Sequence, residues 1–91
     1  MQKIKKTETY QIVLSRSAEK DLNKIDTKYK PHIFAALFDL KNNPYSGKKL
    51  KGKFQDCFSL RVGFYRIIYK TYKKKLNILV IRIGHRQEVY K

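Results

Sequence analysis

The C-terminal third of the chain, residues 58–90, alternates apolar and polar positions in three runs. Gly63 separates the first run from the second, and a lysine triplet at residues 73–75 separates the second from the third. Alternation with a period of two, interrupted by glycine or polar residues, is typical of successive β-hairpins. The pattern therefore predicts a three-stranded antiparallel meander, and the rest of the chain is expected to be arranged around it.

The register of the first predicted hairpin follows from its turn. Gly63 and Phe64 fit a two-residue turn in which the glycine supplies the positive φ of the first turn position. Such a turn places the large apolar side chains of both strands on one face, and a slip of one residue would move them all to the other. The expected cross-strand pairs are Val62 with Tyr65, Arg61 with Arg66, Leu60 with Ile67, and Phe58 with Tyr69.

For the second hairpin, a three-residue loop formed by the lysine triplet keeps the apolar face apolar. The expected pairs are Tyr69 with Leu79, Ile67 with Ile81, Tyr65 with Ile83, and Arg66 with Arg82. Arg61, Arg66 and Arg82 then lie in one row across three strands. Because like charges that face one another are unfavourable unless an anion lies over them, this row predicts a bound polyanion.

The N-terminal half contains one expected strand and two expected helices. The strand is centred on Ile12, with alternate residues facing inward. It leads into an amphipathic helix that ends near Thr27 and whose N-cap is either Ser15 or Ser17. A second helix starts at Pro31, carries a broad apolar stripe, and stops at an Asn-Asn-Pro sequence.

These elements predict a single α+β domain spanning residues 1–91, with the order β-α-α-β-β-β. The two helices form a hairpin that covers one face of a small, mainly antiparallel sheet, and the other face is expected to be open. The pattern does not fix which strand lies beside the first one. A turn-rich connection at residues 44–56 contains Lys48, Lys49 and Lys51, and two interpretations of these lysines stay open: solvated loop residues, or contacts to a phosphate backbone.

The charge balance narrows the possible partners. The chain of 91 residues has 22 Lys and Arg against 7 Asp and Glu, a formal net charge of +15, which attracts nucleic acid, an anionic membrane surface or an acidic protein. The longest apolar stretch, at residues 78–83, is far too short to span a bilayer, so no membrane-spanning segment is expected. A membrane is not among the expected partners. Cys57 is the single cysteine, which excludes an internal disulfide and predicts a reducing, cytoplasmic location.

Few kinds of chemistry fit the sequence. It has no glycine-rich phosphate loop, no nucleophile elbow and no set of His, Cys and carboxylate residues at metal-ligand spacing, so neither a cofactor nor a metal is expected. One group combines cations for a phosphate, an imidazole that titrates near neutrality and a phenol. Its members are Arg61, Arg66, Arg82, His85, Arg86 and Tyr90. The group fits phosphodiester cleavage, although each member also has a purely structural interpretation, as an outward-facing strand residue, a turn residue or a C-terminal anchor.

Three segments resemble the signature segments of the RelE/ParE toxin superfamily, particularly its RelE-type mRNA interferases. They are KKLKG at residues 48–52, FSLRVGFYRIIY at residues 58–69 and IRIGHRQEVY at residues 81–90. The resemblance implies a RelE-like fold and the toxin of a type II toxin–antitoxin system. It further implies a metal-independent endoribonuclease that cuts mRNA in the ribosomal A site by attack of a ribose 2′-hydroxyl on the adjacent phosphate. The implied partners are a RelB-like antitoxin, mRNA and the ribosome, with no DNA bound by the toxin alone.

The catalytic residues of the family carry over unevenly. By the resemblance, Arg61, Arg66, Arg86 and Tyr90 are the catalytic residues, and His85 is a further candidate. Lys48, Lys49, Lys51 and Arg82 are the expected RNA-binding residues. A lysine of well-studied members falls at Ser59, and a loop arginine falls at Lys51. Two other functions remain as alternatives: a ParE-like or degenerate member that acts by binding a protein such as gyrase, and a nucleic-acid-binding module without catalysis.

Overall fold

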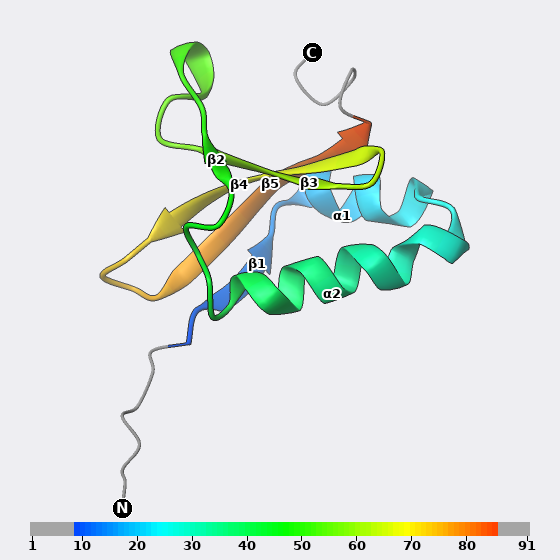
Figure 1. Cartoon of the computed structure of the whole chain (residues 1–91), viewed down its shortest axis with the longest axis horizontal. Coiled ribbons are helices and arrows are strands. Elements are labelled where there is room, and N and C mark those ends of the chain that lie inside the picture. Colours follow the sequence, from blue (N-terminus) through cyan, green and yellow to red (C-terminus); the bar gives the residue numbers. More distant parts are fainter. Residues whose placement is uncertain (1–8, 86–91) are drawn as a thin grey trace, which may run out of the picture.

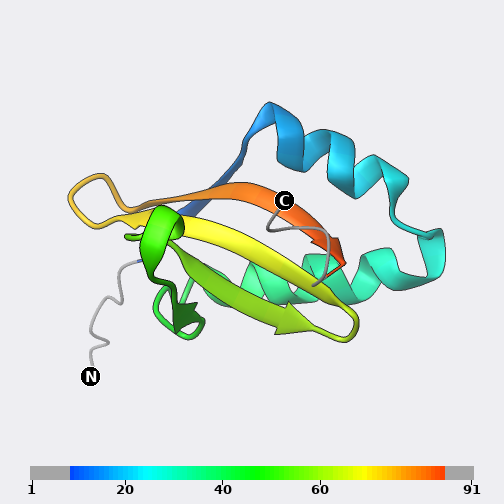
Figure 2. The same cartoon turned by 90° about the horizontal axis from the view of Figure 1, so that it is seen from above.

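The computed structural model describes residues 9–85, in which two helices pack on one face of a five-stranded mixed sheet (Figures 1 and 2). The strand order is β1-β5-β4-β3-β2. The elements are β1 (Gln11–Leu14), α1 (Arg16–Lys24), the 3-10 turn η1 (Thr27–Tyr29), α2 (Lys30–Leu40), β2 (Lys48–Lys49), the 3-10 turn η2 (Gly52–Phe54), β3 (Phe58–Val62), β4 (Tyr65–Tyr72) and β5 (Asn77–His85). The predicted α+β class is confirmed, and β2 is an additional short strand within the expected connection.

The N-terminus of α1 is capped by Ser15, which resolves the choice between the two serines. Its hydroxyl oxygen accepts a hydrogen bond from the Ala18 amide at 3.0 Å and donates one to the Ile81 carbonyl at 2.8 Å. One side chain thus satisfies a helix terminus and also fastens α1 to β5. The helix ends at Lys24, earlier than expected, because the next residue, Ile25, is extended and packs into the core.

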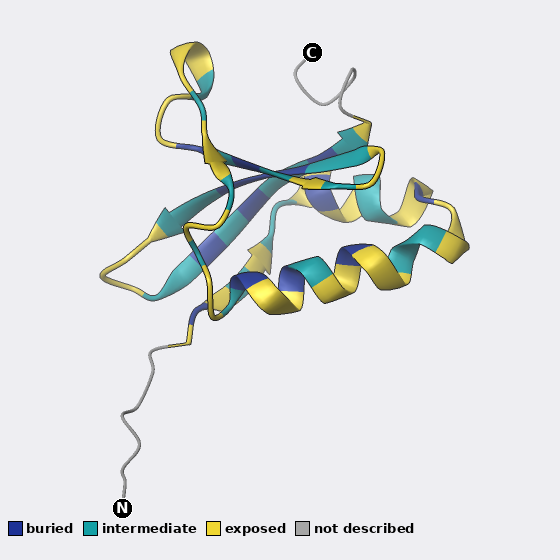
Figure 3. Ribbon diagram, viewed as in Figure 1, coloured by how far each residue is buried: buried dark blue, intermediate teal, exposed yellow. Residues whose placement is uncertain are grey.

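The main core lies between the helices and the sheet. Ala18 and Ile25 from the α1 region and Ile33 from α2 pack against the central strands, where Ile67 and Tyr69 are fully buried. Figure 3 shows the buried positions along the strands and on the inward sides of both helices. Burial of this apolar surface is the main force that holds the helices on the sheet.

The first hairpin has the predicted register. Arg61 faces Arg66, Leu60 faces Ile67, and the turn glycine, Gly63, has φ 61°. The apolar residues of both strands except Ile68 face the helices, as the two-residue turn requires. This prediction is confirmed in full.

The predicted register of the second hairpin is wrong. The turn extends through Leu76, which takes φ 53°, so that Tyr72 faces Asn77 and Tyr69 faces Val80. A bulge then shifts the pairing again, and Ile68 faces Arg82. The bulge has a packing reason: Ile78, Val80 and Ile83 face the main core, and only an extra residue between them reconciles that spacing with alternation.

The shifted register moves Arg82 out of the predicted row. Gly84, not Arg82, faces Arg66. Ile81, the extra residue at the bulge, packs with Ile68 and Cys57 in a second apolar cluster. The predicted row across three strands is therefore a pair, Arg61 and Arg66, on two strands.

Strand β1 pairs in parallel with β5, from Gln11 opposite Asn77 to Leu14 opposite Val80. It covers only the first half of β5. Beyond it, α1 lies along the open edge of β5, where the Ile83 amide donates a hydrogen bond to Asp21 Oδ2 at 2.9 Å. A side chain thus takes the place of the missing neighbouring strand.

The sheet face opposite the helices is partly covered, in contrast to the expectation that it is open. Leu50 and Phe54, from the connection between β2 and β3, pack against the buried pair Cys57 and Ile68. Figure 1 shows η2 rising from this face, on the side away from α1 and α2. The remaining part of the face is called the open face below; its defining residues are Arg61 and Arg66.

Gly47 allows the chain before β2 to come close to the sheet. Its amide donates a hydrogen bond to the Tyr69 hydroxyl at 2.9 Å. A Cβ at this position would lie 2.7 Å from that hydroxyl oxygen and 2.9 Å from the Ser59 carbonyl oxygen, closer than real Cβ contacts. The glycine thus allows β2, which begins at Lys48, to lie against β3.

Candidate functional site

The centre of the candidate site is the cross-strand pair Arg61 and Arg66. Their neighbours Leu60 and Ile67 pack toward the helices, so alternation directs both arginines to the open face. Arg61 is exposed and Arg66 is partly buried. Within residues 9–85 neither guanidinium has a carboxylate partner. Two positive charges are therefore held close together by the strand pairing without a counter-ion.

Arg66 has a defined orientation. Its Nη1 donates a hydrogen bond to the Ser59 hydroxyl oxygen at 3.0 Å, and Ser59 is only 3% exposed. Its Nε is buried and makes no hydrogen bond within the described part of the chain. A buried donor without an acceptor is uncommon in proteins.

Lys48 and Lys49 point to opposite faces of the sheet. Lys48 faces Ser59 and so lies on the open face, whereas Lys49 faces Phe58, whose ring stacks on Tyr69 on the helix side at a centroid distance of 5.4 Å. Directly opposed residues of antiparallel strands share a face. Of these two predicted RNA-binding lysines, Lys48 therefore adjoins the arginine pair.

Lys51 directly precedes η2 and is exposed. The segment that follows is anchored by the packing of Phe54 against Cys57 and Ile68. Cys57 is itself buried, and this burial raises the pKa of its thiol. Lys51 thus lies at the start of η2, and η2 is held on the sheet face opposite the helices.

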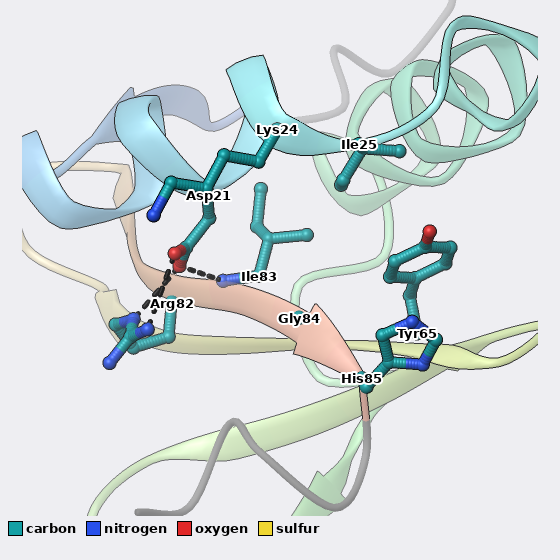
Figure 4. Close-up of a pocket in the computed structure, with 8 residues that line it drawn as sticks. All are labelled: Asp21, Lys24, Ile25, Tyr65, Arg82, Ile83, Gly84 and His85. Atoms are coloured by element: carbon teal, nitrogen blue, oxygen red, sulfur yellow. Dashed lines mark hydrogen bonds and ion pairs between the residues drawn. The ribbon is translucent and has the colours of Figure 1, made fainter.

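Arg82 belongs to a different contact. Its Nε lies 2.8 Å from Asp21 Oδ2 and its Nη2 lies 3.2 Å from Asp21 Oδ1 (Figure 4). Burial alone would raise the pKa of the Asp21 carboxyl, but the hydrogen bonds from Arg82 and from the Ile83 amide outweigh it and lower the pKa below 3.8. Arg82 therefore joins β5 to α1 through an ion pair that was not predicted from the sequence.

His85 lies on the helix side of the sheet, away from the arginine pair. It faces Tyr65, and the two rings have a centroid distance of 4.9 Å. Both line a pocket of about 280 Å³ that also contains Asp21 and Arg82 (Figure 4). Arg86 and Tyr90, the other two predicted catalytic residues, lie outside the described residues.

Two side-chain contacts of the site region were not predicted from the sequence. Ser59 contacts Arg66, and Asp21 contacts Arg82. The confirmed register of the first hairpin contains the signal for Ser59, because a residue diagonal to Arg66 on the same face is within reach of a long side chain. In residues 9–85, no group of three or more His, Cys, Asp or Glu side chains is arranged to hold a metal ion. No helix in the same range is long and apolar enough to cross a membrane.

The sequence matches a family model over residues 12–90, that of the ParE toxin of the type II toxin–antitoxin system parDE. The chain belongs to the RelE/ParE superfamily of type II toxins. This superfamily member is 30% identical over 88 residues to toxin RelG of Mycobacterium tuberculosis, an alignment that covers 90% of this chain and 97% of that protein. The family predicted from the sequence is thereby confirmed.

Solved toxin structures have the same fold as this superfamily member. The RelBE2 toxin–antitoxin complex of Mycobacterium tuberculosis aligns with a TM-score of 0.80 and 28% identity, over 86% of this chain and 99% of that chain. The isolated Escherichia coli RelE toxin aligns with a TM-score of 0.72 and 22% identity, over 84% and 83% of the two chains. The archaeal RelE–RelB complex of Pyrococcus horikoshii aligns with a TM-score of 0.75 and 22% identity, over 89% and 99%.

Proposed function

We propose that this toxin is a metal-independent endoribonuclease that cleaves mRNA, with the ribosomal A site as the place of cleavage. The observation that carries the proposal is the pair Arg61 and Arg66 on the open face, which has no carboxylate partner within residues 9–85. Phosphodiester cleavage by a 2′-hydroxyl passes through a pentacoordinate state with extra negative charge. Fixed cations directed at such developing charge commonly supply the largest catalytic contribution.

Each residue has a role in this proposal. Arg61 and Arg66 hold the scissile phosphate and stabilise the transition state, and Arg86 completes the clamp. Tyr90 transfers a proton, a role that a phenol can perform. His85 has a lesser part, since its ring packs on Tyr65 on the other side of the sheet. Lys48 and Lys51 extend the positive surface along the RNA backbone.

The proposed partners follow from the relatives and from the charge. The RelBE2 structure is a complex of toxin and antitoxin, and a RelB-type antitoxin is the proposed partner here. An acidic or amphipathic antitoxin segment that masks the open face would hold the toxin inactive, because it would neutralise part of the +15 charge. The mRNA and the ribosome, both polyanionic and cytoplasmic, are the proposed targets.

The test is incubation of the purified protein with translating ribosomes, followed by mapping of mRNA 5′ ends. We expect cuts at a fixed position relative to the A site. Arg66→Ala should lower single-turnover cleavage by about 10²-fold or more, as the loss of one transition-state donor does. His85→Gln is the matched control and should cost clearly less. Intact mRNA after incubation with wild-type protein would reject the proposal.

The match to the ParE family model favours one alternative, inhibition of gyrase by protein binding. The same preparation should then block DNA supercoiling and leave ribosome-bound mRNA intact. Running both assays on wild-type protein and on Arg66→Ala separates the two functions. Loss of the supercoiling block in the variant would assign the arginine pair to gyrase binding.

A further inference from the structure

We infer that Ser59 is a positioning residue that sets the orientation of the Arg66 guanidinium on the open face. This inference rests on the proposed function for its catalytic consequence. Its structural part, an ordered Arg66 side chain, is measurable without any activity.

The contact is diagonal across the first hairpin. Ser59 faces Ile68, two residues beyond Arg66 on β4, and its hydroxyl accepts from Arg66 Nη1 at 3.0 Å. Ile68 is fully buried and belongs to the second apolar cluster. Ser59 is itself buried, so its hydroxyl oxygen is presented to Arg66 from within the packed sheet.

Such a contact matters because an arginine side chain has many rotamers. A hydrogen bond with one charged partner is stronger than one between neutral groups, so the Ser59 hydroxyl favours the few rotamers that reach it. The guanidinium is planar and rigid. Fixing Nη1 therefore restricts the directions in which its other N–H groups point, before any ligand arrives.

The orientation of the Arg66 guanidinium has a cost at its buried Nε. In the described part of the chain it is a donor without an acceptor, and a buried unsatisfied donor destabilises the fold. Ser59 holds the guanidinium in this arrangement beside Arg61 rather than releasing it to solvent. A phosphate bound between the two arginines would accept hydrogen bonds from guanidinium N–H groups that Ser59 leaves free. Donors that are fixed before the ligand binds are the preorganisation that transition-state stabilisation needs. A misplacement of about 1 Å can cost on the order of 10²-fold in rate.

The first experiment is a double-mutant cycle in single-turnover RNA cleavage, with Ser59→Ala, Arg66→Ala and the double variant. Ser59→Ala should lower the maximal rate about tenfold, equivalent to ~1.4 kcal/mol. The RNA concentration at half-saturation should hardly change. In the Arg66→Ala background the serine substitution should have no further effect. An equal loss in both backgrounds would overturn the inference.

Two conservative variants separate the hydroxyl from packing. Ser59→Thr keeps the hydroxyl but adds a methyl group at a position that is 3% exposed, whereas Ser59→Cys keeps the size and has a weak acceptor. A positioning role predicts higher activity for Thr than for Cys. Packing alone predicts the reverse order, and that order would reject the inference even if Ser59→Ala failed to fold.

Side-chain ¹⁵N relaxation of Arg66 Nε in the free protein gives the readout that is independent of catalysis. We expect a high order parameter in wild type and in Ser59→Thr, and a lower one in Ser59→Ala and Ser59→Cys. If wild type does not cleave RNA but these order parameters differ as expected, the proposed endonuclease function fails and the positioning role stands. Equal mobility in all four proteins would end the positioning role.

Discussion

At the residue scale, Asp21 is an acidic residue whose structural role is defined by its hydrogen bonds. Its side chain is 13% exposed and accepts hydrogen bonds from Arg82 and from the Ile83 amide. It therefore closes the part of the β5 edge that β1 does not reach. In a chain with only 7 acidic residues, this carboxylate has a structural task that composition alone does not reveal.

The pKa of Asp21 gives a pH-dependent prediction. Because the folded state lowers this pKa below 3.8, the fold favours the ionised carboxylate. The stabilisation is fully present above the unfolded pKa and is lost as the pH falls through the folded value. Asp21→Asn should lower the free energy of unfolding at neutral pH by ~1–3 kcal/mol, since a charged hydrogen-bond partner is removed from Arg82.

Denaturant unfolding of wild type and Asp21→Asn between about pH 7 and about pH 2 measures this effect. The difference between the two proteins should be constant at neutral pH and shrink below pH 3.8. Glu19→Gln, an exposed acidic position on the same helix, is the matched control and should show little difference. A difference that stays unchanged down to the lowest pH would contradict the role of the charge.

At the element scale, the two hairpins show how far the sequence determines the sheet. Gly63 fixes a two-residue turn, and the register of β3 and β4 follows from it. The lysine triplet contains no such signal, because the residue that adopts positive φ is Leu76. The bulge that follows lies in a continuous apolar stretch, where alternation cannot show which residues face the core.

The same limits apply to the candidate site. Arg61 and Arg66 were predictable as a pair because they depend only on the first hairpin. Arg82 was misplaced because its position depends on the bulge, and its partner Asp21 is 61 residues away in the sequence. Ser59 lies diagonal to Arg66 in the predicted register, but a strand pattern does not show that the Arg66 side chain is directed toward it. Short-range turn chemistry was thus predictable, and long-range side-chain partners were not.

Strand β2 provides a prediction with an internal control, since Lys48 and Lys49 are adjacent, both exposed, and directed to opposite faces. If RNA binds the open face, Lys48→Ala should weaken binding and reduce the magnitude of the slope of log K against log salt by about 0.7, the value for one phosphate contact of a single strand. Lys49→Ala should leave both nearly unchanged.

Fluorescence anisotropy with a short single-stranded RNA at several salt concentrations measures both quantities for the two variants. The substitutions remove the same charge from neighbouring positions, so a difference between them reports the face and not the net charge. Equal losses would show that RNA is held by the overall field of the molecule, and a larger loss for Lys49→Ala would place the RNA on the helix side.

At the scale of the whole molecule, the net charge of +15 on 91 residues creates a field that acts well beyond the arginine pair. Such a field steers acidic partners and raises association rates, and salt screens it over about 8 Å at physiological ionic strength. The same field repels copies of the protein from one another. We therefore expect electrostatics to govern how quickly this toxin is neutralised, and short-range packing to govern how long the complex lasts.

This expectation gives a kinetic prediction for the acidic, RelB-type antitoxin proposed as the partner. Raising the salt concentration from about 0.05 M to about 0.5 M should lower the association rate constant by at least tenfold, because steering of opposite charges is screened. The dissociation rate constant should change much less, since it depends on desolvated contacts. Stopped-flow mixing and competition with unlabelled antitoxin measure the two constants separately. Lys48→Glu should slow association more than Lys49→Glu if the antitoxin approaches the open face. An association rate that does not depend on salt would show that the charge of this toxin serves its RNA target and not its capture by the antitoxin.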